Sequence, residues 1–412
     1  MGEIVVGIDI GTSKVCALIG RINSLSQVEV LGKGFEVCSG VKKGTIVDIE
    51  SMSASIKAAV GQAEAMAEMK IKSAYVNISG VHLSVMTQQS WINLAAGKRE
   101  VTEQDVADLL EKVRKTLIPE GNYIIDVIPR QYKVDSNDGI IDPVGMTASM
   151  LGIDADLVLA KSASVHNIMK CMEKAGVKIE GLVIESLATG SMLLTQDERQ
   201  MGVLLIDVGG ETTDITIIRN NNLLFTGALP VGGEHITNDI AIGLKIPFGE
   251  AEKFKKQYDL ALTSLIKYDQ EELVSDIGDS TKKSVKISQM VEIVEARVYE
   301  IFSLCKEQLQ TAGIDENDIP GIVLTGRGIS FFDGAVELAQ EVFQVPVRIV
   351  SLKGNAGIKL EHSTCAGMIK YVAAHCKDSV MVEANTPERK KDSKTAREGI
   401  GEKIANFLRN LF

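Results

Sequence analysis

The sequence predicts an α/β fold made of two similar halves, with an α+β module inserted into the first half. Two strand-and-turn segments, at residues 7–14 and 204–217, predict the two halves. Each reads as an apolar strand, an aspartate, a glycine turn, hydroxyl residues and a second β-rich run, which is typical of a hairpin. The order of strands and helices over residues 1–80 also recurs, loosely, over residues 203–350, as an internal duplication would leave it.

Residues 1–80 are predicted to form three strands, a helix and a further strand. The helix is predicted over residues 50–69, because apolar residues recur there at helical spacing. These residues are Met52, Ile56, Ala59, Val60, Ala63 and Met66. The strands are predicted at residues 4–10, 14–22, 28–35 and 74–79.

Residues 82–161 form the predicted inserted module. A strand is expected at residues 83–94, and Thr102 with Asp105 forms a capping-box pattern that opens a helix. Two more strands are expected, and a turn-rich segment separates them. The strands lie at residues 123–134 and 147–160, and the turn-rich segment at residues 135–143.

From residue 162 the alternation of helices and strands resumes. Helices are predicted at residues 164–175, 187–194, 236–241, 249–258, 287–310, 332–343 and 365–375. Besides the second hairpin, strands are predicted at residues 179–184, 321–324 and 347–350. Residues 377–398 have few bulky apolar side chains and no aromatic ones, so they are expected to be a flexible linker.

Composition excludes several classes of protein. The chain has 412 residues, of which 45% are hydrophobic and 24% charged, as expected of a soluble globular protein. Its formal charge of −11 argues against general nucleic-acid binding. The 6 cysteines include no CxxC pair and favour reduced, buried thiols over a metal site. No secretion signal, membrane-spanning run, P-loop or GxGxxG motif is recognised.

The two predicted hairpins carry the chemistry. A tight glycine turn offers backbone N–H groups to an anion, and an aspartate at a strand end suits the hydrated cation that accompanies a polyphosphate. One such turn alone is usually only a turn, but two in one chain favour a nucleotide held between them. The first candidate set is Asp9, Gly11, Thr12, Ser13 and Lys14, and the second is Asp207, Gly209, Gly210, Thr212 and Thr213. Asp9 and Asp207 are expected to hold Mg²⁺ through water, and Lys14 to neutralise a phosphate.

Further candidates concern the nucleoside. The glycine turn Gly326-Arg327-Gly328 follows an apolar strand and would let a base approach the backbone, although an ordinary strand-to-helix turn reads the same way. Glu252 and Lys255 share one helix face and would reach the ribose, the alternative being a solvated ion pair. Gly233 completes the predicted nucleotide set.

Together these segments resemble the actin, Hsp70 and sugar-kinase superfamily, in which two phosphate hairpins and an adenosine turn occur in this order. Within it the chain is most similar to the FtsA family of bacterial cell-division actin homologues. The stretches that carry this resemblance are residues 43–50, 76–82, 99–102, 140–146 and 237–241, and the similarity covers nearly the whole chain.

The resemblance implies an actin-like duplicated two-domain ATPase fold, with an inserted α+β subdomain IC on the opposite side of subdomain IA from actin's IB. The boundaries that follow are IA at 1–81, 162–195 and 363–376, and IC at 82–161. Subdomain IIA takes 196–233 and 313–362, IIB takes 234–312, the linker is 377–398, and an amphipathic membrane-targeting helix is 399–412.

The resemblance also implies ATP binding with Mg²⁺, self-assembly into filaments, and tethering of the tubulin-like FtsZ to the cytoplasmic face of the membrane at the division site. Other division proteins would bind subdomain IC. The C-terminal tail of FtsZ would dock on Lys283, Arg297 and Glu300, unless Arg297 and Glu300 simply pair along their helix. Glu185 would orient an attacking water or merely start a helix. Any ATPase activity is expected to be weak, and the protein is expected to act primarily as a scaffold.

Two other functions remain as alternatives: a pilus-assembly or shape-determining scaffold, and a small-molecule kinase. The chain also departs from the family pattern at three positions. Glu211 replaces a third glycine of the second phosphate turn, Arg327 interrupts the adenosine turn, and Ser186 stands where proline is common. Glu211 would repel polyphosphate unless it points away or touches the metal, and Arg327 would either stack on adenine or crowd it.

The C-terminal residues predict an interfacial membrane anchor. Six large apolar residues fall on one face of a helix: Ile400, Ile404, Phe407, Leu408, Leu411 and Phe412. Residues 389–412 carry seven Lys/Arg against three Asp/Glu, so they suit an anionic membrane surface. At roughly 21 Å the helix is too short to cross a bilayer. The alternative is a helix that docks on the protein's own core or on a partner.

Overall fold

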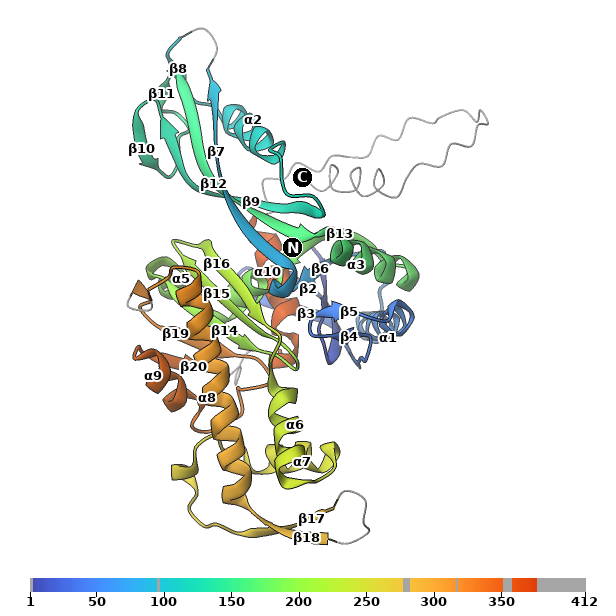
Figure 1. Cartoon of the computed structure of the whole chain (residues 1–412). Coiled ribbons are helices and arrows are strands. Elements are labelled where there is room, and N and C mark those ends of the chain that lie inside the picture. The colour runs from blue at the N-terminus through green and yellow to red at the C-terminus, as the bar shows by residue number, and fades with distance from the viewer. Residues whose placement is uncertain (1–2, 95–96, 277–281, 316–317, 351–357, 376–412) are drawn as a thin grey trace.

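A computed structural model of the chain describes residues 3–94, 97–276, 282–315, 318–350 and 358–375 (Figure 1). Two five-stranded sheets repeat one topology, with strand orders β13-β6-β1-β2-β3 and β16-β15-β14-β19-β20. In each sheet an antiparallel hairpin is extended by a third antiparallel strand on one side and by parallel strands on the other. The duplication predicted from the sequence is therefore confirmed.

The first sheet consists of β1 (Val5–Ile10), β2 (Lys14–Ile22), β3 (Val28–Val37), β6 (Ser73–Ile78) and β13 (Lys178–Ile184). The helices α1 (Ile49–Ala67) and α3 (Ser162–Ala175) pack together, while α4 (Glu185–Leu193) packs against α10 (Ser363–His375), which also contacts β1 and β2. A short hairpin, β4 (Val41–Lys42) with β5 (Thr45–Ile46), precedes α1.

Helix α1 covers β2 and β3 with the apolar face that the sequence predicts. Met66 is the exception: it lies in the last turn of the helix, and 54% of its surface is exposed to solvent. Glycines of β3 allow the close approach: a Cβ on Gly34 would lie 1.8 Å from the carbonyl oxygen of Ala59.

The second sheet consists of β14 (Val203–Val208), β15 (Thr213–Arg219), β16 (Asn222–Leu229), β19 (Ile322–Thr325) and β20 (Val347–Ile349). Its helices are α5 (Gln196–Met201), α6 (Gly233–Leu244), α7 (Phe248–Tyr258), α8 (Ile287–Thr311) and α9 (Ala335–Phe343). The core of this half runs from the sheet through α6 and α8 to the hairpin β17 (Glu271–Ser275) and β18 (Lys282–Lys286).

The inserted module projects from the first half, at the top of Figure 1. Its sheet has the order β10-β9-β12-β7 and consists of β7 (Leu83–Asn93), β9 (Asn122–Val134), β10 (Asn137–Ile140) and β12 (Met150–Lys161). Helix α2 (Glu103–Arg114) packs on it, and β8 (Arg99–Glu100) pairs with β11 (Thr147–Ala148). The predicted capping box of Thr102 and Asp105 is present.

Several elements differ from the sequence prediction. Strand β10 lies within the segment expected to be rich in turns, and α5, β16 and the hairpin β17–β18 were not predicted. The strand expected over residues 147–160 is interrupted at Ser149, because the carboxylate of Asp135 accepts hydrogen bonds from the N–H groups of Ser149 and Met150. Helix α9 begins at residue 335, after Gly334 in a left-handed conformation (φ +95°).

The described cysteines Cys16, Cys38, Cys171, Cys305 and Cys365 are free and buried. Among the described residues, no helix is long and apolar enough to cross a membrane. The predicted linker at residues 377–398 and the predicted helix at 399–412 lie outside the described residues.

Candidate functional site

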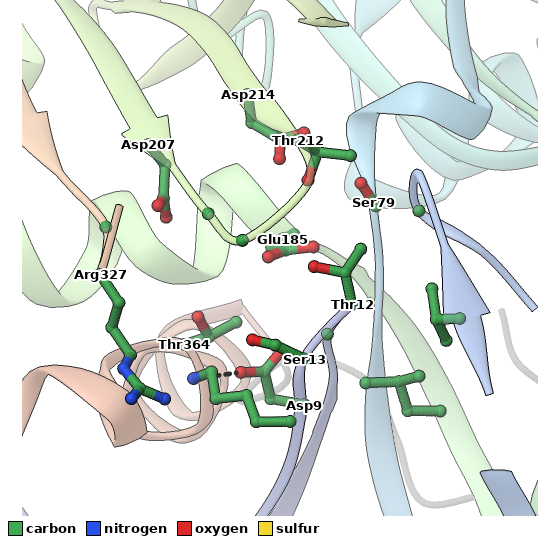
Figure 2. A pocket seen from close by; sticks show the side chains of 18 of the residues that line it. Asp9, Thr12, Ser13, Ser79, Glu185, Asp207, Thr212, Asp214, Arg327 and Thr364 are labelled. Carbon is green, nitrogen blue, oxygen red and sulfur yellow. Dashed lines mark hydrogen bonds and ion pairs between the residues drawn. The ribbon is translucent and has the colours of Figure 1, made fainter. Parts of the chain in front are cut away.

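The two glycine turns face each other across a cleft between the halves (Figure 2). The cleft encloses about 740 Å³, including space open to solvent. In the first turn the Gly11 N–H donates to the Lys14 carbonyl oxygen at 2.9 Å, and in the second the Gly209 N–H donates to that of Thr212 at 2.8 Å. The same strand–turn–strand geometry is thus built twice and aimed at one cavity.

The turns also touch each other. The backbone N–H of Glu211 donates to the Thr12 hydroxyl at 3.4 Å. A Cβ on Gly210 would lie 3.1 Å from that hydroxyl and 3.3 Å from the Ser13 hydroxyl. Glycine at this position therefore keeps open the narrow part of the cleft, where the two turns meet.

Twelve of the predicted residues line the cleft: Asp9, Gly11, Thr12, Ser13, Lys14, Glu185, Asp207, Gly209, Gly210, Thr212, Gly326 and Arg327. Among further lining residues, Ser79, Asp214, Ser363 and Thr364 were not predicted. Asp214 directly follows the second turn's hydroxyl pair, so its position was a usable signal. Ser79 lies in a stretch that carried the family resemblance, but nothing in that stretch indicated its chemistry.

Four carboxylates gather in this cleft, from Asp9, Glu185, Asp207 and Asp214. Burial raises the pKa of Asp207 to about 6; the charge of Lys14 opposes this rise, and the charge of Asp9 adds to it. Burial and the charge of Asp207 raise the pKa of Asp214 to about 7. Burial, followed by the charges of Asp214, Asp9 and Asp207, raises the pKa of Glu185 well above its usual range. A bound cation would relieve this accumulation of like charge.

Lys14 also lines the cleft and is in contact with one of these acids. Its ammonium donates to the Asp9 carboxylate at 3.1 Å and to the Glu361 carbonyl oxygen at 2.6 Å. Burial alone would lower the pKa of Lys14, but the charge of Asp9, the thiols of Cys16 and Cys365 and the hydrogen bond to Asp9 together outweigh it, and the pKa lies above its ordinary value. Lys14 therefore stays charged at the cleft. Within the described residues, no group of three His, Cys, Asp or Glu side chains is arranged to hold a metal ion directly.

Glu211 points away from the cleft. Its carboxylate accepts a hydrogen bond of 2.6 Å from the backbone N–H of Lys43, in the turn between β4 and β5 of the other half. The repulsion expected from an acid at this position is thus avoided by side-chain direction. Arg327 does line the cleft, and its guanidinium carbon lies 5.8 Å from the ring centroid of Phe35 on β3.

The adenosine-type turn requires glycine at residue 326. Gly326 has φ +98°, and a Cβ there would lie 2.2 Å from the Val208 carbonyl oxygen. Gly328 supports the turn from behind, because its N–H donates to the same oxygen at 2.8 Å. Neither Gly328 nor Gly233 lines the cleft; the Gly233 N–H donates to the Gly209 carbonyl oxygen at 2.9 Å.

Three other predicted residues lie outside the cleft lining. Thr213 is fully buried, and its hydroxyl donates to the Val231 carbonyl oxygen. Glu252 and Lys255 form an ion pair of 2.8 Å, and Lys255 is only 4% exposed and donates to the Gly233 carbonyl oxygen. Burial opposes the ionised form of Glu252, but the hydrogen bonds from Lys255 and its neighbours lower the pKa of Glu252 to about 2. The pair is a buried support for the start of α6 rather than a solvated pair.

The three residues expected to bind FtsZ are engaged within this chain. Arg297 pairs with Asp239 and, at 2.5 Å, with Glu300. The ammonium of Lys283 donates to the Asp276 carboxylate and to the Lys245 carbonyl oxygen, each at 2.9 Å. The pairing of Arg297 with Glu300 along one helix, weighed from the sequence as an alternative, is present.

Comparison with known proteins gives matches over most of the chain. The family model described as "Cell division protein FtsA" matches residues 204–368, and that described as "SHS2 domain inserted in FTSA" matches residues 80–159. The cell division protein FtsA of Pseudomonas aeruginosa is 36% identical over 375 residues, covering 90% of this chain and 89% of its own. The FtsA of Bacillus subtilis is 34% identical, covering 91% of this chain and 84% of its own. The FtsA of Escherichia coli K12 is 31% identical, covering 90% of each chain.

Solved structures with low sequence identity share the fold. The PilM–PilN type IV pilus biogenesis complex has a TM-score of 0.59 at 15% identity, covering 90% of this chain and 98% of that chain. MreB5 of Spiroplasma citri bound to ADP has a TM-score of 0.56 at 15% identity, covering 91% and 99%. The chain therefore has the predicted actin-like ATPase fold with an inserted α+β domain.

Proposed function

Because the chain belongs to the FtsA family of cell division proteins, we propose that it is an ATP-binding filament protein that tethers the FtsZ ring to the cytoplasmic membrane and helps recruit the division machinery. One observation carries the nucleotide part of this proposal. Two equivalent glycine turns, from two halves of one duplicated fold, face the same acid-lined cleft.

Each part of the cleft suits one part of Mg²⁺–ATP. The N–H groups of the two turns would bind the phosphates, with Lys14 adding positive charge. Asp9 and Asp207 would hold the cation through water, and the cation would neutralise phosphate charge. The open backbone at Gly326 would admit the base, and Arg327, which lines the cleft, would cover it.

Nucleotide binding is tested with two substitutions and matched controls. Asp207→Ala and Gly210→Leu should abolish binding of a fluorescent ATP analogue in a titration with Mg²⁺. Asp138→Ala, at an exposed acid of the module, and Gly249→Leu, where a Cβ meets nothing within 4 Å, should leave it unchanged. Unaltered circular dichroism spectra would show that the fold persists. Tight binding by folded Asp207→Ala would contradict the assigned site.

Hydrolysis, if it occurs, would use Glu185. Its carboxylate lies in the cleft, where it would face an attacking water and accept its proton. Glu185→Gln keeps the size of the side chain and removes this capacity. The substitution should leave ATP binding intact and lower the release of phosphate, measured under single-turnover conditions. Equal hydrolysis by parent and variant would remove Glu185 from this role.

The acidic tail of FtsZ would dock on the half that contains α8, beside Lys283, Arg297 and Glu300. Arg297 is paired with Asp239 and Glu300 in the free chain, so the tail would exchange partners with it rather than meet a free cation. Arg297→Glu should weaken tail-peptide affinity measured by fluorescence anisotropy. Lys57→Glu, an exposed position on α1, is the control for net charge.

Membrane attachment would depend on residues 399–412. Half-burying six large side chains contributes roughly 6–9 kcal/mol gross, and ordering a short helix consumes much of it. A single anchor should therefore bind anionic lipid weakly, and anchors linked along a filament should bind firmly. Phe407→Glu should abolish flotation with anionic vesicles. Asn410→Glu, which adds the same charge to the polar face, should weaken flotation much less. Should Phe407→Glu float as well as the parent, the helix is a docking element.

The alternatives are a pilus-assembly or shape-determining scaffold and a small-molecule kinase. The likeness to PilM and MreB proteins shows the fold alone, whereas the FtsA relatives match in sequence over about nine tenths of the chain. Co-sedimentation of FtsZ with lipid vesicles only when residues 399–412 are present would favour the proposed function. Sedimentation that does not depend on this helix would favour another mode of attachment.

A further inference from the structure

Asn77 lies at the junction of two functional carboxylates. It is the second-last residue of β6 and only 2% exposed. Its amide nitrogen donates to the Asp9 carboxylate at 2.9 Å and to the Glu185 carboxylate at 3.0 Å. Its amide oxygen accepts the N–H of Ile10 at 2.7 Å. One side chain therefore connects β1, β6 and the start of α4 directly behind the cleft.

The orientation of the amide is fixed by the backbone. The Ile10 N–H can only donate, so the atom facing it must be the amide oxygen, and both amide hydrogens then face the two carboxylates. Asp9 has a second partner in Lys14. For Glu185, the Asn77 amide is the only hydrogen-bond donor among the described residues. Glu185 thus depends on Asn77 for its placement.

A neutral amide suits this position better than a charged group. A lysine would form ion pairs with both carboxylates and compete with a bound cation, whereas a carboxylate would add to the four acids already in the cleft. The amide donates twice and adds no net charge. Asn77 is not among the residues that line the cleft around the phosphate turns, so it would act on a ligand only through Asp9 and Glu185.

We propose that Asn77 is a positioning residue of the nucleotide site, which sets the spacing between the cation-holding carboxylate of Asp9 and the water-facing carboxylate of Glu185. This inference rests on the proposed function, because it assigns Asp9 to Mg²⁺ and Glu185 to water. Groups that orient a metal site from behind typically alter metal affinity or activity 10–100-fold when they are replaced. A residue of that kind acts on the Mg²⁺-dependent part of nucleotide binding and on hydrolysis.

Two variants of the full-length protein test the proposal. Asn77→Asp has the same shape and keeps an oxygen for the Ile10 N–H, but it replaces the double donor by a carboxylate. Asn77→Ser is smaller and uncharged, and it cannot reach both carboxylates, so it serves if the aspartate variant does not fold. Asn167→Asp is the matched control, because Asn167 borders a neighbouring small cavity and has no hydrogen bond to either carboxylate.

The readout separates positioning from general stability. A fluorescent ATP analogue is titrated with Mg²⁺ present and again in EDTA, and phosphate release is followed in single turnover. We expect the Mg²⁺ concentration for half-maximal binding to rise about 10-fold or more in both Asn77 variants. Binding in EDTA should change much less, and the control should resemble the parent.

Each outcome has one meaning. If a folded Asn77 variant needs no more Mg²⁺ than the parent and releases phosphate equally fast, the positioning role is wrong. Equal losses of binding with Mg²⁺ and in EDTA would show a purely structural role and overturn the proposal too. If the parent itself binds no Mg²⁺–nucleotide, the proposed function fails first, and the inference about Asn77 falls with it.

Discussion

Replacing Asp207 by asparagine should stabilise the nucleotide-free protein while it destroys nucleotide binding. The Asp207 carboxylate lines the same cleft as Asp9, and within the described residues it accepts no hydrogen bond. Asparagine has nearly the same shape and no charge. A residue that destabilises the folded protein but is required for ligand binding is typical of a binding site.

The magnitude follows from the pKa of Asp207, which burial raises from 3.8 to about 6. A fully buried group with this change would destabilise the folded protein by about 3 kcal/mol above pH 6. Asp207 is only partly buried, so screening reduces the effect to about 1–2 kcal/mol. For a chain of two halves, this corresponds to a rise of a few degrees in melting temperature.

The sign of the effect depends on pH in a defined way. The folded protein holds the Asp207 proton more tightly than the unfolded chain, so the destabilisation is absent below about pH 4 and complete above about pH 6. Parent and Asp207→Asn should therefore melt together near pH 4, and the variant should melt higher at pH 8. Differential scanning fluorimetry at both pH values, with Asp138→Asn as an exposed control, measures the difference.

Saturating Mg²⁺–ATP provides the second half of the test. The parent should gain stability from the ligand, because only the folded state binds it. The Asp207→Asn variant should gain little or nothing. A variant that melts below the parent at pH 8 without nucleotide would refute the reasoning from buried like charges, whatever the ligand does.

Three other predictions, the first with a matched control, test the structure. Gly34→Ala should lower the free energy of unfolding by about 1–3 kcal/mol in urea titrations, since its Cβ would meet a carbonyl oxygen of α1. The control Gly61→Ala, whose Cβ would have no atom within 4 Å, should raise the free energy of unfolding by about 0.5–1 kcal/mol. Asp105→Ala should destabilise the module by about 1–2 kcal/mol at pH 7 in melts followed by circular dichroism. Hydrogen bonds hold the pKa of Asp105 below its usual range, so the difference between parent and variant should shrink only below about pH 4. Glu211→Ala should speed nucleotide release several-fold in stopped-flow measurements, because it removes a contact between the halves.

Much of the fold could be predicted from the sequence because its signals are local. Each of the two hairpins combines an apolar run, an aspartate and glycines within about a dozen residues. The capping box of Thr102 and Asp105 marks the start of α2 within four residues. The strands that were missed lack such signals. Strand β18 contains three lysines in five residues, and only Val285 is buried, so its partner β17 and the helix α8 decide its structure.

The candidate site was predicted where one turn supplies several residues, and it was incomplete where distant elements meet. Asn77 acquires its role because β6 runs parallel to β1 and because α4 begins where β13 ends, which brings Asp9 and Glu185 to one amide. Neither neighbour is close in sequence. Thr213 shows the opposite error, since its hydroxyl belongs to the motif but is directed into the core.

Side-chain direction is the other quantity that the motif did not contain. Glu211 and Arg327 depart from the glycine pattern of the family. Glu211 was expected to repel polyphosphate unless it points away or touches the metal, and Arg327 was expected either to stack on adenine or to crowd it. In the structure both cross from the second half to the first: Glu211 binds the Lys43 N–H, and Arg327 lies over the ring of Phe35. Lys43 has a left-handed conformation (φ +48°), and its N–H is turned toward the second half, where the Glu211 carboxylate accepts its hydrogen bond. The two departures therefore act as contacts between the halves at the rim of the cleft, so their effect on a nucleotide depends on how far the cleft opens rather than on their charge alone.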